Sequence, residues 1–152
     1  MTKIAIASDH HGVSLKAQLV GMLKGMGYDV SDEGPASADA VDYPDFAARV
    51  SRKVADGQVD SGVLICGSGI GMAIAANRFP GVRAAVCYDA ELAELSRRHN
   101  NANVVCLSGD RVSADANAEI VRLWLATDFD GGRHARRVDK LEQFPGNQAE
   151  SC

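Results

Sequence analysis

Residues 62–71 read Gly-Val-Leu-Ile-Cys-Gly-Ser-Gly-Ile-Gly, a short apolar run that ends at three closely spaced glycines. The run predicts a strand that is buried on both faces, because it lacks the apolar–polar alternation of a half-exposed strand. The glycines open a helix that we expect over about 69–78. A strand that leads directly into a helix is the repeating unit of parallel α/β sheets.

The same alternation of strand and helix runs along the rest of the chain. Further strands are predicted at residues 3–8, 28–30, 82–87 and 103–108, and further helices near 13–26, 45–56, 90–99, 113–126 and 133–143. This pattern predicts the α/β class: a single Rossmann-like three-layer α/β/α sandwich with a five-stranded parallel sheet and right-handed crossovers. We expect one domain over residues 1–144 and a disordered tail over 145–152.

Composition excludes several classes of protein. With 152 residues, 46% hydrophobic and 24% charged, the chain is typical of one soluble domain. A net charge of −4 argues against binding to nucleic acid or to an anionic membrane. No apolar run approaches the ~20 residues of a membrane span. The N-terminal residues enter a strand without the apolar stretch of a signal peptide, and the cysteines form no C-x-x-C pair. We therefore expect reduced thiols and a cytoplasmic location.

Ligands of doubly wound sheets bind beyond the carboxyl ends of the strands. Polar residues concentrate at these predicted ends, in the segments Ser8–Gly12, Cys66–Gly71, Cys87–Asp89 and Ser108–Arg111. Cys66 is the most informative of them, because the start of a helix favours a thiolate that can act as nucleophile or general base. The alternative is a turn cysteine with packing glycines. Met72 rules out a dinucleotide fingerprint, which needs Gly there, and a Cys-x5-Arg phosphatase loop, which needs Arg.

Asp9, His10 and His11 form a second cluster, after the first strand. A carboxylate beside imidazoles suits proton transfer or phosphate binding. The competing interpretation is that Asp9 caps the helix that follows.

Two more candidates lie in the second half of the chain. Arg133 and Arg137 are four residues apart and therefore share a helical face, where they could clamp a phosphate. A solvated basic face and a nucleic-acid patch are the alternatives. His99 ends a predicted helix, where a positive charge is favourable without any catalytic role, and the asparagines after it suit an ordinary turn.

Taken together and in order, several segments resemble one known family. They are Ser8-Asp9-His10, Asp42-Tyr43-Pro44, residues 64–71, residues 74–77, residues 95–100, Asn103-Val104, and Gly131-Gly132-Arg133-His134 with Arg137. From Lys3 to about Arg137 the chain resembles ribose-5-phosphate isomerase type B, a family that includes the galactose-6-phosphate isomerase subunits.

The resemblance implies an isomerase of the pentose phosphate pathway that interconverts D-ribose 5-phosphate and D-ribulose 5-phosphate without metal or other cofactor. It matches Cys66 to the base that moves a proton between C2 and C1 of the sugar through an enediolate. It matches Ser68, together with the amides of Gly67, Gly69, Ile70 and Gly71, to the group that stabilises the developing oxyanion.

The resemblance also implies the remaining site residues and the assembly. His99 matches the residue that opens the furanose ring, with Asp9 nearby, and Asn100 matches a sugar-hydroxyl contact. The substrate-binding set is completed by His10, Tyr43, Arg111, Arg133 and Arg137, of which His10 and the arginines match phosphate ligands. Family sites form between the subunits of a homodimer, so we expect His99, Asn100 and Arg111 to come from the partner chain; pairing of dimers into tetramers stays open.

The chain departs from the family pattern at a few places. Some relatives use a glutamate one helical turn after the cysteine position as base, but residues 69–75 contain no glutamate, which favours Cys66. Arg111 is shifted by one residue, and His11 has no counterpart. The same chemistry on a hexose 6-phosphate is the alternative substrate assignment. A non-catalytic sugar-phosphate-binding module is the alternative class, and Cys66 beside Ser68 argues against it.

Overall fold

The computed structural model describes residues 1–144 and contains a parallel sheet with the strand order β2-β1-β3-β5-β4. The strands are β1 (Lys3–Ser8), β2 (Asp29–Asp32), β3 (Ser61–Cys66), β4 (Ala84–Val86) and β5 (Val104–Ser108). The helices are α1 (Val13–Gly25), α2 (Tyr43–Ala55), α3 (Ile70–Ala76), α4 (Ala90–Arg98), α5 (Ala114–Ala126) and α6 (Arg133–Leu141). The predicted tail from residue 145 lies outside the described residues.

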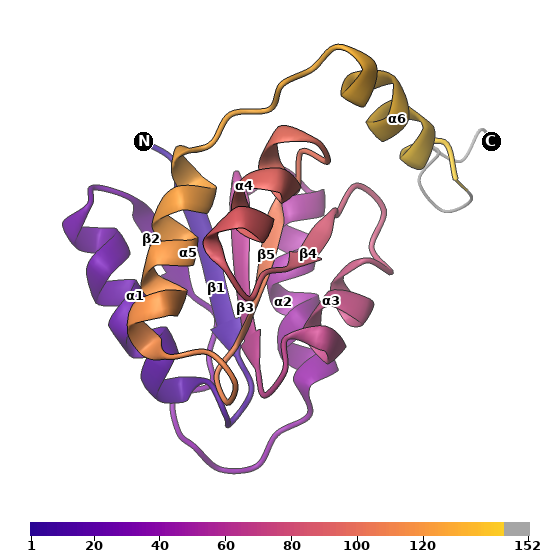
Figure 1. Cartoon of the computed structure of the whole chain (residues 1–152). Helices are drawn as coiled ribbons and strands as arrows, with labels where there is room; N and C mark the ends of the chain where they lie inside the picture. The colour runs from indigo at the N-terminus through magenta and orange to yellow at the C-terminus, as the bar shows by residue number, and fades with distance from the viewer. Residues whose placement is uncertain (145–152) are drawn as a thin grey trace.

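Two apolar layers cover the two faces of the sheet, as the continuous apolar strands predict. On one face α1 and α5 pack against the strands, with the buried Leu19 and Trp124 at the centre of that core, and α4 packs against α5 (Figure 1). On the other face α2 and α3 contribute Val50 and Met72, which are fully buried. The expected three-layer α/β/α sandwich with a five-stranded parallel sheet is confirmed.

The order of the strands creates a switch point between β1 and β3. From β1 the chain moves outward to β2 and then returns to β3 on the other side of β1. The loops that follow β1 and β3 therefore diverge at the carboxyl edge of the sheet, where doubly wound folds bind their ligands. Ser8 pairs with Ile65 and Cys66 pairs with Ser108, so three strands end side by side.

Helix α2 begins two residues earlier than its apolar pattern predicts. The helix starts at Tyr43, with Pro44 in its first turn. Proline is well accepted there, because the first N–H groups of a helix have no partner within the helix. Tyr43 is therefore placed by the first turn of α2.

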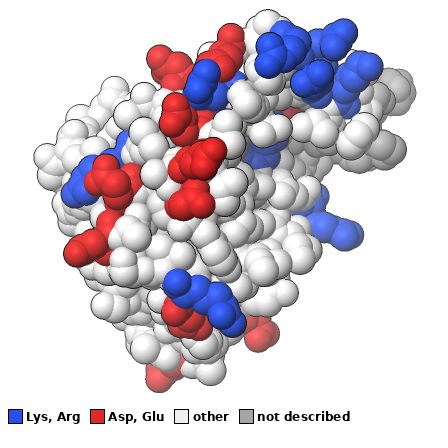
Figure 2. Space-filling model, in the orientation of Figure 1, with Lys and Arg blue, Asp and Glu red and all other residues white. Residues whose placement is uncertain are grey.

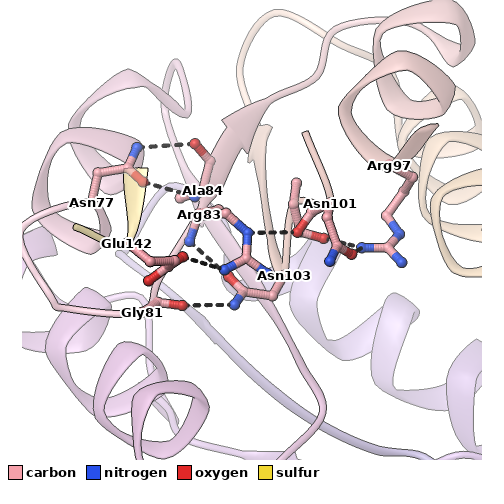
Figure 3. Close-up of polar contacts among 9 residues, drawn as sticks. Asn77, Gly81, Arg83, Ala84, Arg97, Asn101, Asn103 and Glu142 are labelled. Atoms are coloured by element: carbon pink, nitrogen blue, oxygen red, sulfur yellow. Dashed lines mark hydrogen bonds and ion pairs between the residues drawn. The ribbon is translucent and has the colours of Figure 1, made fainter. Parts of the chain in front are cut away.

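Helix α6 stands away from the sheet, beyond the amino-terminal ends of β4 and β5 (Figure 1). Arg83, just before β4, holds the end of this region through an ion pair of 2.6 Å with Glu142. The same guanidinium donates to the carbonyl of Asn101, while the side chain of Asn103 accepts from the backbone N–H of Arg83 (Figure 3). Asn101 and Asn103 therefore tie this turn to the start of β4.

No helix in the described part of the chain combines the length and apolarity that a membrane crossing requires.

Candidate active site

The first group of candidate residues surrounds the turn between β3 and α3. Cys66 ends β3, is 5% exposed, and its Sγ accepts a hydrogen bond of 3.1 Å from the N–H of Gly69. Gly69 has φ +80° and lies so close to β5 that a Cβ would be 3.2 Å from the carbonyl of Leu107. Both features require glycine at this position. The turn therefore holds the sulfur at the carboxyl edge of the sheet.

The amides of this turn are less available for an oxyanion than expected. The N–H of Gly69 donates to Cys66, and the N–H of Ile70 donates to the Ser68 hydroxyl oxygen at 3.1 Å. Of the four amides assigned to the oxyanion, these two are already engaged in this structure. Because Ser68 Oγ accepts from the N–H of Ile70, its own O–H remains a donor. The Tyr88 hydroxyl donates a hydrogen bond of 2.6 Å to the Ser68 carbonyl and so holds the turn.

A pocket of about 620 Å³ lies beside this turn, between the loop after β1 and the start of α2. It is lined by Asp9, His10, His11, Val41, Asp42, Tyr43, Pro44 and Asp45. The ring of Tyr43 fills the space above Gly71, where a Cβ would meet it at 2.8 Å. The structure thus brings Tyr43 next to the turn that carries Cys66.

The hydrogen bonds of Asp9 and His10 differ from those of a helix cap. The N-cap of α1 is Gly12, without a side-chain bond, so the interpretation of Asp9 as a helix cap is wrong. The Asp9 carboxylate instead accepts the N–H of His11 at 2.9 Å, and Nδ1 of His10 accepts the N–H of Val41 at 3.2 Å. These bonds order the loop and leave Nε2 of His10 as the ring donor.

Arg111 belongs to this same group and not to the group of His99. Its N–H donates to the Ser108 hydroxyl at 2.9 Å, and the preceding Asp110 donates its N–H to the Gly67 carbonyl at 3.2 Å. Within one chain, Arg111 and His99, which the resemblance assigns to the same subunit of a shared site, therefore lie apart. The reason is that the loop after β5 ends at the carboxyl edge, whereas α4 runs back to the opposite edge.

The second group of candidate residues lies at that opposite edge. A pocket of about 360 Å³ is lined by His99, Asn100, His134, Arg137, Val138 and Leu141. Lys and Arg side chains gather over α6, whose sequence supplies Arg133, Arg136, Arg137 and Lys140 (Figure 2). A cationic helix beside polar side chains is a suitable site for a phosphate dianion.

His134 packs directly on His99, a contact that sequence reasoning missed. The two rings stack with centroids 4.3 Å apart and planes inclined by 9°. Burial lowers the pKa of His134, and the neighbouring His99, Arg133 and Arg137 lower it further. A neutral His134 therefore forms one wall against which the His99 ring is held. The residue stands within the quoted Gly131–His134 motif, but no periodicity in the sequence distinguishes it.

The two groups cannot meet within one chain. Helix α4 begins after the carboxyl end of β4 and places His99 at its far end. Its nine residues span about 13 Å at 1.5 Å per residue. The structure therefore brings Cys66, Ser68, Asp9, His10, Tyr43 and Arg111 to one edge, and His99, Asn100, Arg133 and Arg137 to the other.

Two groups among the described residues have metal-capable atoms within 4.8 Å of one another: Asp9 with His10 and His11, and His99 with Asp130 and His134. The stacked rings of His99 and His134 are nearly parallel, so their in-plane lone pairs do not point at a common centre. Nδ1 of His10 is occupied by the N–H of Val41.

The other described cysteines are core residues, as their apolar surroundings predict. Burial raises the pKa of the Cys87 thiol to about 11, and it also raises that of the fully buried Cys106. A protonated thiol is a poor nucleophile, so neither is a candidate base. Cys152 lies outside the described residues.

Comparison with known proteins identifies the family of this chain. The family described as Ribose/Galactose Isomerase matches residues 4–141. Ribose-5-phosphate isomerase B of Escherichia coli K12 is 44% identical over 141 residues, which cover 93% of this chain and 95% of the relative. The chain therefore belongs to the Ribose/Galactose Isomerase family.

Solved structures agree with this assignment. Ribose-5-phosphate isomerase B of Clostridium thermocellum superposes with a TM-score of 0.91 at 47% identity, covering 92% of this chain and 95% of that one. Ribose-5-phosphate isomerase B of Mycoplasma genitalium was crystallised with bound ribulose 5-phosphate. It superposes with a TM-score of 0.93 at 44% identity, and the match covers 97% of this chain and 98% of that one.

Proposed function

We propose that this protein interconverts D-ribose 5-phosphate and D-ribulose 5-phosphate in the pentose phosphate pathway, without metal or other cofactor. The observation that carries the proposal is the turn at the switch point of the sheet, in which the N–H of Gly69 holds the Cys66 thiol and the N–H of Ile70 holds the Ser68 hydroxyl. The relation to the M. genitalium enzyme, which binds ribulose 5-phosphate, supports the choice of substrate. A thiol base also requires a reducing compartment, which favours the cytoplasm.

The chemistry assigns one role to each group near Cys66. With the ring open, the thiolate takes the proton from C2, and the electron pair of that bond forms a C1–C2 double bond while negative charge develops on O1. The Ser68 O–H donates to that oxygen. The thiol then returns its proton to C1, the hydroxyl proton of O2 passes to O1, and the carbonyl is left at C2.

We propose that the second group reaches this chemistry from a partner subunit. His99 then opens the ring, Asn100 contacts a sugar hydroxyl, and Arg133 and Arg137 bind the phosphate together with His10 and Arg111 of the first chain. Two observations support a symmetric dimer with shared sites. The two groups lie at opposite edges of one chain, and large apolar side chains are exposed, among them Tyr43, Ile70, Ile74, Leu92, Leu141 and Phe144. A two-fold axis would complete both sites at once.

The test is an assay of the purified protein with ribose 5-phosphate, allose 6-phosphate and galactose 6-phosphate, each with and without a chelator. We expect kcat/KM to be highest for ribose 5-phosphate and to be unchanged by the chelator. A preference for either hexose phosphate would replace the substrate assignment while keeping the chemistry. No turnover of any of the three would refute the proposed function, and loss of turnover with chelator would refute its independence from metal.

A further inference from the structure

His11 and Asp110 form a pair that neither the resemblance nor the proposed mechanism uses. Nδ1 of His11 lies 3.1 Å from Oδ2 of Asp110, and the two side chains are 45% and 52% exposed. The pair joins the loop after β1 to the loop after β5, and it lies over Gly67. A Cβ on Gly67 would be 2.8 Å from Oδ2 of Asp110 and 3.9 Å from Cγ of His11. The pair therefore borders the Cys66 turn directly.

The contact fixes which nitrogen of His11 carries hydrogen. A carboxylate oxygen only accepts hydrogen bonds, so Nδ1 of His11, which faces it, is the protonated nitrogen. In the neutral imidazole Nε2 then presents a lone pair. The other nearby carboxylate, Asp9, is engaged with the backbone N–H of His11 and leaves the ring to Asp110.

His10, the neighbouring ring, is held in the opposite form. Its Nδ1 accepts the N–H of Val41, so its Nε2 carries the hydrogen. The two rings are 4.4 Å apart and line the same pocket. With both rings neutral, the pocket offers a ring donor from His10 and a ring acceptor from His11. A phosphate dianion has only acceptors and suits the first, whereas a sugar hydroxyl can donate to the second.

We propose that His11, oriented by Asp110, determines sugar binding by accepting a hydrogen bond from a substrate hydroxyl at Nε2, and that it is not a phosphate ligand. This inference rests on the proposed function, because it assumes a sugar phosphate in the pocket. No bond is made or broken in this step. The role differs from that of His10, which presents N–H to the phosphate.

Two amide substitutions separate this role from a purely structural one. In His11→Gln the side-chain amide reaches the position of Nε2 and can accept from a hydroxyl. In His11→Asn it reaches only the position of Nδ1, so it keeps the link to Asp110 and loses the acceptor. His11→Ala loses both. Loss of one such hydrogen bond raises KM about three- to ten-fold, and kcat changes little because the bond is made equally in ground and transition states.

The experiment measures KM and kcat for ribose 5-phosphate and the competitive inhibition constant of inorganic phosphate, for wild type and the three variants. We expect KM to rise in His11→Ala and His11→Asn, and to return most of the way to the wild-type value in His11→Gln. The inhibition constant of inorganic phosphate should stay within two-fold of the wild-type value in all three variants. Wild-type turnover is established first, and its absence would refute the proposed function. Given turnover, a wild-type KM in His11→Asn would overturn the inference and leave a structural tie, while phosphate inhibition weakened in parallel with KM would make His11 a phosphate ligand.

Discussion

Gly12 tests how tightly the loop that carries the candidate residues is packed on the sheet. This residue is the N-cap of α1 and directly follows Asp9, His10 and His11. A Cβ at Gly12 would lie 2.5 Å from Cγ2 and 2.9 Å from Cβ of Ile65, and 2.9 Å from Cβ of Ser8. Ile65 and Ser8 are fully buried, and their Cβ atoms are fixed by the backbone, so rotation of the side chains cannot relieve both contacts.

Gly12→Ala must therefore displace the loop or the strands. Overpacking of this kind costs about 2–3 kcal/mol, which corresponds to a fall in Tm of about 4–12 °C for a chain of this size. Displacement of the loop also lowers kcat/KM. Gly21→Ala, in the middle of the same helix, is the matched control, because a Cβ there meets nothing within 4 Å.

The control should gain about 0.5–1 kcal/mol, because alanine is favoured over glycine inside a helix. The measurement is urea unfolding of wild type and both variants, with kcat/KM measured on the same preparations. A Gly12→Ala variant as stable and active as wild type would refute the packing argument.

Three further predictions concern the proposed site. Cys66→Ala should abolish turnover while ribose 5-phosphate still binds within a few-fold by calorimetry, because the thiol acts in proton transfer; near-normal turnover would remove Cys66 as the base. Arg137→Ala should weaken ribose 5-phosphate binding about ten- to hundred-fold but leave the poor substrate ribose unaffected; equal effects on both would make the arginine structural. Because the pKa of His134 is lowered in the folded chain, the unfolded chain takes up its proton first as pH falls through the ordinary value of 6.5. Thermal stability should therefore fall on acidification below that pH, less steeply in His134→Gln, and identical pH profiles would contradict the shift.

The layered fold was predictable because the signals are local. Residues 62–66 show a strand buried on both faces, and the glycines that follow mark the turn into a helix. The structure packs Gly69 and Gly71 closely against Leu107 and Tyr43, which is what the alternative interpretation of packing glycines predicts. The strand order was not predictable in this way. Insertion of β5 between β3 and β4 depends on how the crossovers pack, and the sequence of β5 is apolar in either position.

The separation of His99 from Cys66 within one chain was expected from the resemblance, but the place of Arg111 was not. The resemblance assigns Arg111 and His99 to the same subunit of a shared site, and the structure places them at opposite edges of the sheet of one chain. The stack of His134 on His99 depends on how α6 docks, which is a tertiary contact. The His11–Asp110 pair likewise joins residues distant in sequence, through loops that only the sheet brings together.

The central claim is that each site takes Cys66 from one chain and His99 from another. Cys66→Ala and His99→Asn homodimers then each contain two defective sites, whereas a mixed dimer contains one doubly defective site and one intact site. Random reassortment makes about half of the dimers mixed, so two-fold symmetry predicts recovery to about one quarter of wild-type activity.

The measurement is the activity of the two inactive variants after co-refolding, with subunit exchange verified by differently tagged chains. Recovery to about one quarter of the wild-type rate is the result that the shared site predicts. Verified exchange without recovery would contradict it, because both residues would then serve a site within one chain or His99 would have no part in the chemistry.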